Sequence, residues 1–128
     1  MPFSSPQAAL RFYGEEINKH RFDLLLSVLS DDVVFWFSSG SHHGLDAARQ
    51  AFERTWTRLG NEFYWLEDVC WISEGVDSAT CIYRFNRRGT VEGEPARGEG
   101  RGTSVFRKEQ GGWKLVHEHL SAEPAHAG

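Results

Sequence analysis

The side chains of this sequence that could do acid–base or binding chemistry include Tyr13, His42, Arg84 and Glu118. Glu118 lies on a predicted strand, where an inward carboxyl group could bind a polar ligand or act as a base with a raised pKa. Because a lone buried charge is strongly disfavoured, Arg84 on a neighbouring strand is its expected partner. We favour a structural ion pair between Glu118 and Arg84 over a catalytic one.

Histidines offer a second kind of chemistry. His117 and His119 are two positions apart on one predicted strand, so both side chains point to the same face. They could supply two metal ligands, with His42 or His43 as a third, but zinc and iron sites need three or four converging ligands. We therefore predict no metal. The pair is instead expected in a sheet face that contacts a second copy of the chain, where imidazole titration could make the contact depend on pH.

Motifs for nucleophilic catalysis and for phosphate binding are missing. The segment 39–43 lacks the Gly-x-Ser-x-Gly pattern of the serine hydrolases. The glycine-rich segment 98–102 leads into a predicted strand rather than a helix, so it does not resemble a phosphate-binding loop. No cofactor is expected.

The elements that must position these side chains fit into one domain. The chain has 128 residues, of which 40% are hydrophobic and 25% are charged. A single domain over 1–128 can therefore bury a core without disulfide bonds or a structural metal. We expect its ordered core at about 5–122. Nine Phe, five Trp and three Tyr form a heavy aromatic share, and such rings must fill a core, line a cavity or cover an interface.

Charge and hydropathy exclude several classes of partner. A net charge of −4 gives no strong field for nucleic acid or for an anionic membrane. No segment approaches the roughly 18 apolar residues that span a bilayer, and the first residues do not resemble a signal peptide, so the cytoplasm is expected. Cys70 and Cys81 lie on strands that we expect to pair. Reduced thiols are favoured there over a cross-strand disulfide.

Three helices are predicted in the first half of the chain. Ser5 and Pro6 indicate the start of the first, and a short second helix is predicted from about Asp23 to Leu29. An apolar strand is predicted at 33–37 with both faces covered. The third helix carries an apolar stripe from Leu45 to Leu59, and Gly60 is a ready C-terminal cap.

Strands follow at 61–73, 77–87, 101–108 and 113–121, with an exposed loop predicted at about 90–100. This order predicts an α+β fold in which helices cover one side of an antiparallel sheet. Both faces of the 61–73 strand are apolar: Phe63, Trp65, Val69 and Trp71 alternate with Tyr64, Leu66, Cys70 and Ile72. One face can pack on the helices, and we expect a homodimer to bury the other.

Several short sequence segments, in the order in which they occur, resemble those of a known family. They are the segment 18–23 before 30–34, then 44–48, and the final segment 111–121. Along nearly its whole length the chain resembles the nuclear transport factor 2-like superfamily in its SnoaL-like branch. The last phrase is also similar to the close of the association domain of calcium/calmodulin-dependent protein kinase two. The resemblance implies a cone-shaped, strongly curved sheet with the helices on its concave side (a cystatin-like α+β roll), and it does not imply one function.

The resemblance also implies where a site would lie. The expected pocket residues are Tyr13, Ile17, Phe37, Phe52, Trp56, Leu66, Arg84, Ser104 and Glu118, and the expected dimer face holds Trp71, Thr103, His117 and His119. Ketosteroid-isomerase-like members use a helical Tyr, matched by Tyr13, together with two acids. The acids' positions correspond to Phe37 and to Thr103 or Ser104 here, so that chemistry is not expected. The cavity arginines of the kinase relatives correspond to Ser104 and Leu120, so their anion site is not carried over.

Three functions remain open on these observations. The leading hypothesis is a dimeric binding module whose apolar pocket takes a small hydrophobic or weakly anionic molecule. The rival is an enzyme, an isomerase, dehydratase or hydrolase, that acts on a small cyclic hydrophobic substrate through Tyr13, Glu118, Arg84 and His42. The third is a pure association module with a vestigial cavity.

Overall fold

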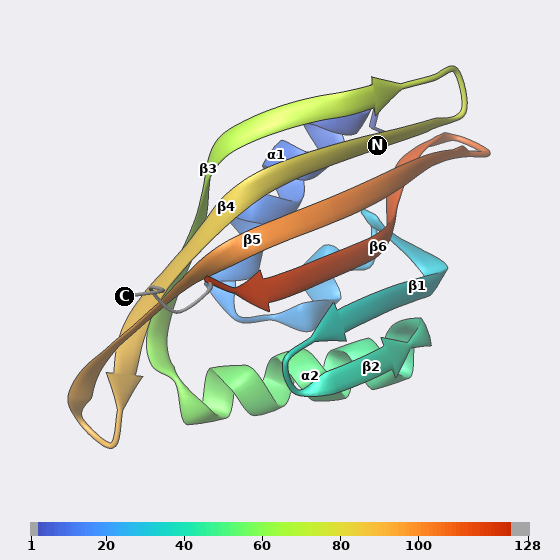
Figure 1. The fold of residues 1–128 in the computed structure, drawn as a ribbon. Helices are drawn as coiled ribbons and strands as arrows, with labels where there is room; N and C mark the ends of the chain where they lie inside the picture. The colour runs from blue at the N-terminus through green and yellow to red at the C-terminus, as the bar shows by residue number, and fades with distance from the viewer. Residues whose placement is uncertain (1–2, 124–128) are drawn as a thin grey trace.

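A sheet of six strands packs against two α-helices in the computed structural model, which describes residues 3–123 (Figure 1). Along the chain the elements are α1 (Pro6–Glu16), the 3-10 turns η1 (Ile17–Lys19) and η2 (Phe22–Leu25), β1 (Leu29–Phe37), β2 (Gly40–His43), α2 (Gly44–Arg58), β3 (Gly60–Glu74), β4 (Ser78–Val91), β5 (Glu94–Glu109) and β6 (Gly112–Ala122). The predicted α+β class is confirmed. Residues 124–128 of the predicted C-terminal tail lie outside the described residues.

The strand order in the sheet is β2-β1-β6-β5-β4-β3. Neighbouring strands are antiparallel except β1 and β6, which run parallel and join the first strand of the chain to the last. The predicted antiparallel sheet is thus confirmed, with one parallel pairing that the sequence did not predict. Figure 1 shows α1 behind the long strands β4 and β5, which bend strongly along their length. We call the helix side of the sheet its inner face and the opposite side its outer face.

The two α-helices form where the sequence predicts them, but the short helix between them does not. Ser5 caps α1 by accepting a hydrogen bond from the backbone N–H of Ala8 at 3.1 Å, and Pro6 opens the helix. Over the segment predicted as a second helix only η2 forms, because Leu29 already pairs with Leu115 in the sheet. Gly60 does not cap α2, since it begins β3. Within residues 3–123 neither α-helix is long and apolar enough to cross a bilayer.

The predicted exposed loop at 90–100 is strand instead. It spans the end of β4 and the start of β5, joined by a tight turn in which Gly93 has a φ of 81°. The glycines that suggested a loop lie in register with large side chains of β4: Gly98 faces Arg87, Gly100 faces Phe85 and Gly102 faces Tyr83. These large side chains lean over the glycines, which leave them room. We call this arrangement the glycine ladder.

Two of the β-bulges in the sheet decide which side chains of β6 and of the second half of β3 face inward. In β6, Leu115 pairs with Phe106 and His117 pairs with Val105, so Val116 is an extra residue and the alternation of faces shifts by one. Leu115 and Glu118 consequently both point to the inner face, where each is buried. In β3, Asp68 adopts a φ of 55° within a bulge between Glu67 and Cys70.

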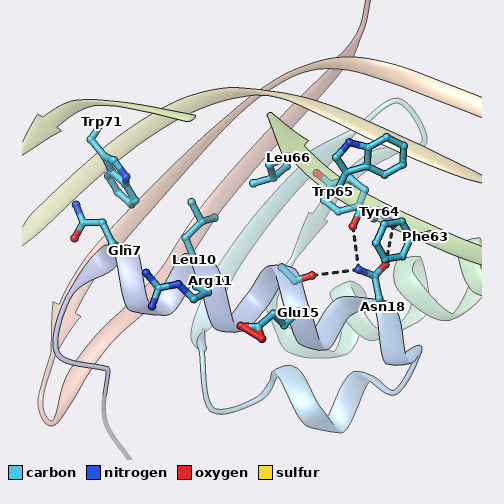
Figure 2. Close-up of a pocket in the computed structure, with 11 residues that line it drawn as sticks. Gln7, Leu10, Arg11, Glu15, Asn18, Phe63, Tyr64, Trp65, Leu66 and Trp71 are labelled. Atoms are coloured by element: carbon cyan, nitrogen blue, oxygen red, sulfur yellow. Dashed lines mark hydrogen bonds between the residues drawn. The ribbon is translucent and has the colours of Figure 1, made fainter. Parts of the chain in front are cut away.

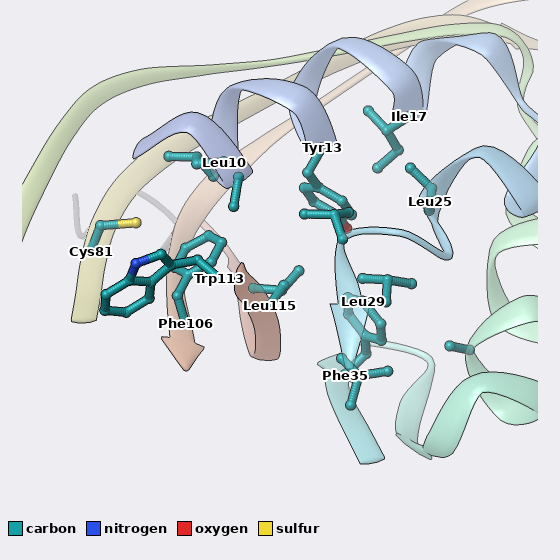
Figure 3. Close-up of a cluster of buried hydrophobic side chains, with 14 of the residues drawn as sticks. Leu10, Tyr13, Ile17, Leu25, Leu29, Phe35, Cys81, Phe106, Trp113 and Leu115 are labelled. Carbon is teal, nitrogen blue, oxygen red and sulfur yellow. The ribbon is translucent and has the colours of Figure 1, made fainter. Parts of the chain in front are cut away.

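The core lies between α1 and the inner face of the sheet. In Figure 3 the side chains of Leu10 and Tyr13 of α1, and of Ile17 of η1, point toward the sheet. Tyr13 is 1% exposed, and Phe35, Phe106 and Leu115 beneath it are fully buried. This packing fixes the position of the Tyr13 hydroxyl group.

Candidate functional site

An interior cavity of about 170 Å³ opens between α2, the inner face of the sheet and the end of β6. Aromatic side chains form much of its wall: Phe37, Phe52, Trp56, Tyr64 and Phe85. The Phe52 and Trp56 rings stack at 5.6 Å between centroids, and the Tyr64 and Phe85 rings stack at 6.0 Å. The shape and lining suit a flat apolar molecule.

Glu118 lies at the closed end of this cavity and is 2% exposed. The hydroxyl group of Tyr13 donates to its Oε2 at 3.3 Å, and that of Tyr83 donates to its Oε1 at 3.5 Å. Both distances are long against the roughly 2.8 Å that is usual for O–H···O bonds. The Tyr83 hydroxyl group makes a shorter contact, 2.7 Å, with Ser104 Oγ. Glu118 therefore has only weak hydrogen-bond partners for its charged form.

Burial raises the pKa of Glu118 to about 8, and the bonds from Tyr13 and Tyr83 offset only part of that effect. No basic side chain contributes to the shift. The pKa of each of Tyr13, Tyr64 and Tyr83 is raised well above its usual value by burial and then by the nearby Glu118. The carboxyl group is thus mainly protonated at neutral pH, and a protonated carboxyl group can donate one hydrogen bond.

Tyr64 contributes a second polar group to the cavity. Its residue is 7% exposed, and its buried hydroxyl oxygen has no hydrogen-bond partner among residues 3–123. Its backbone is held firmly, because its N–H donates to Asn18 Oδ1 at 2.7 Å and its carbonyl accepts from Asn18 Nδ2 at 2.9 Å. A buried hydroxyl group without a partner costs stability, and a hydrogen bond from a ligand would offset that cost.

The mouth of the cavity carries charge of both signs. Arg58, at the end of α2, and Arg87 of β4 line it together with Glu62 and Glu99. Arg87 Nη1 lies 3.9 Å from Glu62 Oε2, and burial raises the pKa of Glu62 although Arg87, His20 and Arg58 oppose the shift. The mouth is therefore polar, whereas the wall behind it is aromatic.

Five of the residues predicted for the pocket line the cavity: Ile17, Phe37, Phe52, Trp56 and Glu118. Tyr13 and Ser104 lie behind the cavity wall, where Tyr13 bonds Glu118 directly and Ser104 bonds Tyr83. Simple alternation along β6 would place Glu118 on the same face as Lys114 and Val116. The bulge at Val116 groups it with Leu115 instead.

Arg84 was wrongly placed in the pocket. It lies between Tyr83 and Phe85, which point inward, so its own side chain points to the outer face. There Arg84 Nη2 pairs with Glu123 Oε1 at 2.5 Å, and the expected pair with Glu118 does not form. The set of four polar residues expected for an enzyme is therefore not assembled.

Leu66 lines a different and more open hollow, the groove between α1 and β3, which has a volume of about 680 Å³ (Figure 2). Figure 2 shows Asn18 bonded to Tyr64 at one end of this groove and Trp71 at the other. Trp71 was expected on the outer dimer face. The bulge at Asp68 turns it inward, where its ring packs on Phe106 at 5.6 Å between centroids.

The other predicted dimer residues do share the outer face. His119 pairs with Thr103, and the Trp36 ring meets the rings of His117 and His119 edge-on at 5.2 and 5.5 Å. His117 Nδ1 donates to the carbonyl oxygen of Val34 at 2.7 Å. Among residues 3–123 no three His, Cys, Asp or Glu side chains come together as metal ligands.

His42 and the two cysteines lie apart from the carboxyl group. His42 is 8% exposed, its Nε2 lies 3.0 Å from Ser39 Oγ, and burial, followed by Arg54, lowers its pKa. Cys70 is exposed on the outer face. Cys81 is buried on the inner face, where burial and then Glu118 raise its pKa to about 12. Both are free thiols, as favoured from the sequence.

Tyr83, Arg58, Arg87 and Glu62 were not expected at the site. The sequence does contain a pattern that points to Tyr83 and Arg87: large residues alternate along β4, and glycines alternate along β5 opposite them. The pattern can be recognised only when the two segments are known to pair. Nothing in the sequence pattern distinguishes Arg58 from the other arginines of α2.

Comparisons with known proteins agree with this fold. The model of the SnoaL-like domain matches residues 7–125. A nuclear transport factor 2 (NTF2-like) superfamily protein from Salmonella enterica superposes with a TM-score of 0.83 at 20% identity, over 94% of this chain and 89% of that one. A proposed calcium/calmodulin dependent protein kinase II association domain from Xanthomonas campestris gives 0.81 at 18% identity, over 94% and 86%.

A protein of unknown function with a cystatin-like fold from Nostoc punctiforme gives a TM-score of 0.80 at 15% identity, over 99% of this chain and 98% of that one. These structural similarities confirm the predicted fold. No curated protein matches the sequence.

Proposed function

The chain belongs to the SnoaL-like domain family, and from this premise we propose that it binds a small ring compound carrying one oxygen substituent. The interior cavity, at about 170 Å³, is close in size to a 150 Å³ apolar cavity that accepts benzene. Its aromatic wall favours a flat ring over a flexible chain.

The observation that carries the proposal is the unpartnered hydroxyl group of Tyr64 in a cavity that ends at Glu118. A hydroxyl or carbonyl oxygen on the ring would give Tyr64 its missing hydrogen bond. Glu118, with a pKa of about 8, would supply a second donor at neutral pH. A ring without oxygen would leave the Tyr64 hydroxyl group without a partner, so the site is expected to prefer the oxygenated ring.

We propose binding rather than catalysis because only part of the enzyme hypothesis is met. Glu118 and Tyr13 converge beside the cavity, but Arg84 lies on the outer face with Glu123. The association-module hypothesis requires a cavity filled by the protein's own side chains, and the volume between Phe52, Tyr64 and Glu118 argues against it.

The first prediction is that 4-ethylphenol binds to the protein and that Tyr64→Phe weakens this binding about fivefold, the value of one hydrogen bond of about 1 kcal/mol. The variant should bind ethylbenzene as well as the wild type does, because only the hydroxyl group is removed. Isothermal titration calorimetry measures both affinities. Without ligand, Tyr64→Phe should also raise the free energy of unfolding by about 1 kcal/mol, since it removes an unpartnered buried polar atom.

Two results would contradict this assignment. Absence of binding by both compounds would reject the cavity as a ligand site. Equal losses of affinity for 4-ethylphenol and ethylbenzene in Tyr64→Phe would show that the variant changes packing rather than a hydrogen bond.

We also propose that the outer face joins two copies of the chain. Trp36 and Ile82 are 45% and 40% exposed on this face, beside His119 and Thr103. Exposed apolar surface of this kind favours burial against an identical surface.

The second prediction is that the protein sediments as a dimer at micromolar concentration and that Trp36→Glu sediments as a monomer. A charge placed on a buried, unpaired position of the contact is strongly unfavourable. Val76→Glu is the matched control, because Val76 is 83% exposed in the β3–β4 turn and lies outside this face. A monomeric wild type in sedimentation velocity would reject the dimer.

A further inference from the structure

A second hollow, of about 300 Å³, adjoins the mouth of the interior cavity. It is lined by Arg58, Leu59, Arg87, Val91, Ala96, Arg97 and Gly98, and we call it the arginine hollow. Three of these residues are basic and none is acidic, in a chain whose net charge is −4. A concave surface with one sign of charge attracts the opposite charge.

The arginine hollow and the interior cavity are adjacent, because Arg58, Arg87 and Gly98 line both. Gly98 belongs to the glycine ladder and faces Arg87 across the strand pair. A Cβ atom at Gly98 would lie 3.1 Å from Arg87 Nε, so the glycine leaves the space that the Arg87 side chain occupies. The sequence thus keeps Arg87 at the junction between an aromatic cavity and a basic hollow.

Within residues 3–123, Arg87 makes only one distant ion pair and Arg58 makes none. The nearest carboxylate oxygen to Arg87 is that of Glu62, at 3.9 Å, which is beyond hydrogen-bond distance. Burial raises the pKa of Glu62, which weakens it as a competitor for the guanidinium group. Glu62 and Glu99 line the interior cavity, but neither lines the arginine hollow. The acidic side chains at the junction are therefore on the cavity side, and the lining of the arginine hollow is basic.

We propose that the ligand is an amphiphile whose oxygenated ring fills the interior cavity and whose carboxylate group lies in the arginine hollow against Arg58 and Arg87. The proposal rests on the proposed function and specifies its substrate class. Guanidinium groups bind carboxylates through charge-assisted hydrogen bonds, which are stronger than neutral ones. Arg58 and Arg87 are then specificity-determining residues, and Tyr64 and Glu118 orient the other end of the molecule.

The test compares two compounds that differ only in the anionic group, 4-ethylphenol and 3-(4-hydroxyphenyl)propanoate, by isothermal titration calorimetry at neutral pH. The carboxylate compound should bind to the wild type about tenfold more tightly or better. Because the arginines are partly exposed, this advantage should shrink as salt is added, whereas the affinity for 4-ethylphenol should change little. Propanoate alone should bind far more weakly than either, since it lacks the ring.

The double variant Arg58→Gln with Arg87→Gln should lose the tenfold advantage of the carboxylate compound over 4-ethylphenol. This ratio of affinities is measured within the one variant, so any change in its binding of the ring cancels. Arg54→Gln is the matched control: Arg54 lies one turn earlier on α2 and lines neither the cavity nor the arginine hollow. It should keep the full advantage.

The outcomes separate the two proposals. If 4-ethylphenol binds and the carboxylate adds no affinity, the amphiphile proposal is wrong and the binding function stands. An advantage that survives in the double variant, or propanoate binding as tightly as the full compound, also overturns the amphiphile proposal. If neither phenol binds, the proposed function fails as well.

Discussion

The Glu118→Gln variant is expected to gain stability over the wild type as the pH rises. The difference between their free energies of unfolding should be about 3 kcal/mol more favourable to the variant at pH 7 than at pH 4.5. In the folded wild type the carboxyl group has a pKa of about 8, against 4.5 when it is exposed. Between these values the unfolded chain releases the proton and the folded chain keeps it. The folded state therefore binds more protons, and wild-type stability falls as the pH rises from 4.5 toward 8 and levels off above 8.

The amide side chain of the Glu118→Gln variant cannot titrate, so the variant lacks this loss. Its amide oxygen can still accept from Tyr13 and its amide N–H can donate to Tyr83, which keeps the buried polar atoms paired. Denaturant unfolding of both proteins at several pH values measures the difference. Glu94→Gln, at the exposed start of β5, is the control and should leave the pH dependence unchanged. Parallel stability curves for the wild type and Glu118→Gln would mean that Glu118 is ionised normally in the fold.

Gly102→Ala is expected to lower the free energy of unfolding by about 3 kcal/mol. The added Cβ atom would collide with the Tyr83 ring and would approach Leu120 Cδ2 to 2.7 Å. The Tyr83 ring is buried on the inner face and cannot yield without moving strand β4, whereas the Leu120 side chain lines the cavity and can turn away. Displacing Tyr83 would also remove its contacts with Ser104 and Glu118.

The control for this variant is Arg101→Ala, at the next position of β5, whose side chain is exposed. It should change stability by no more than about 0.5 kcal/mol. Denaturant unfolding of the two variants under the same conditions provides the measurement. Equal stability of Gly102→Ala and Arg101→Ala would contradict the steric role of the glycine ladder.

The sequence predicted those features that depend on local periodicity. The apolar stripe of α2 and the Ser5-Pro6 start of α1 both have a helical period that tertiary packing then reinforces. The turns at Gly75 and Gly111 likewise separate strands of clear alternation. The family phrases placed these elements in order, and the fold followed from them.

The side-chain directions in the strands could not be predicted as well, because a single extra residue reverses every face after it. Val116 has this effect on Glu118, and Asp68 has it on Trp71. Neither residue type marks a bulge in advance. Arg84 was misplaced for a different reason: charge complementarity with Glu118 was weighed without knowledge of Glu123, which lies close to Arg84 only in the folded chain.

The segment at about 90–100 was predicted as an exposed loop because it is rich in glycine, which is intrinsically poor in strands. Its strand conformation depends on Tyr83, Phe85 and Arg87 of the partner strand, which cover the glycines. The covering side chains and the glycines belong to different segments of the chain, so a short stretch of sequence does not contain both. The role of Tyr64 is of the same kind, since Asn18, on η1, fixes its backbone from a distant part of the sequence.

The parallel pairing of β1 with β6 has a consequence for how the protein is made. Val34 lies beside His117, so β1 must wait for the final strand before its second edge is hydrogen-bonded. Pairing between strands so far apart in the sequence is slow to form. Until it forms, the unpaired edge of β1 is exposed to misassociation during synthesis on the ribosome. The carboxyl group that closes the cavity is carried by that same final strand, so a nascent chain acquires its binding site and completes its sheet in one late step.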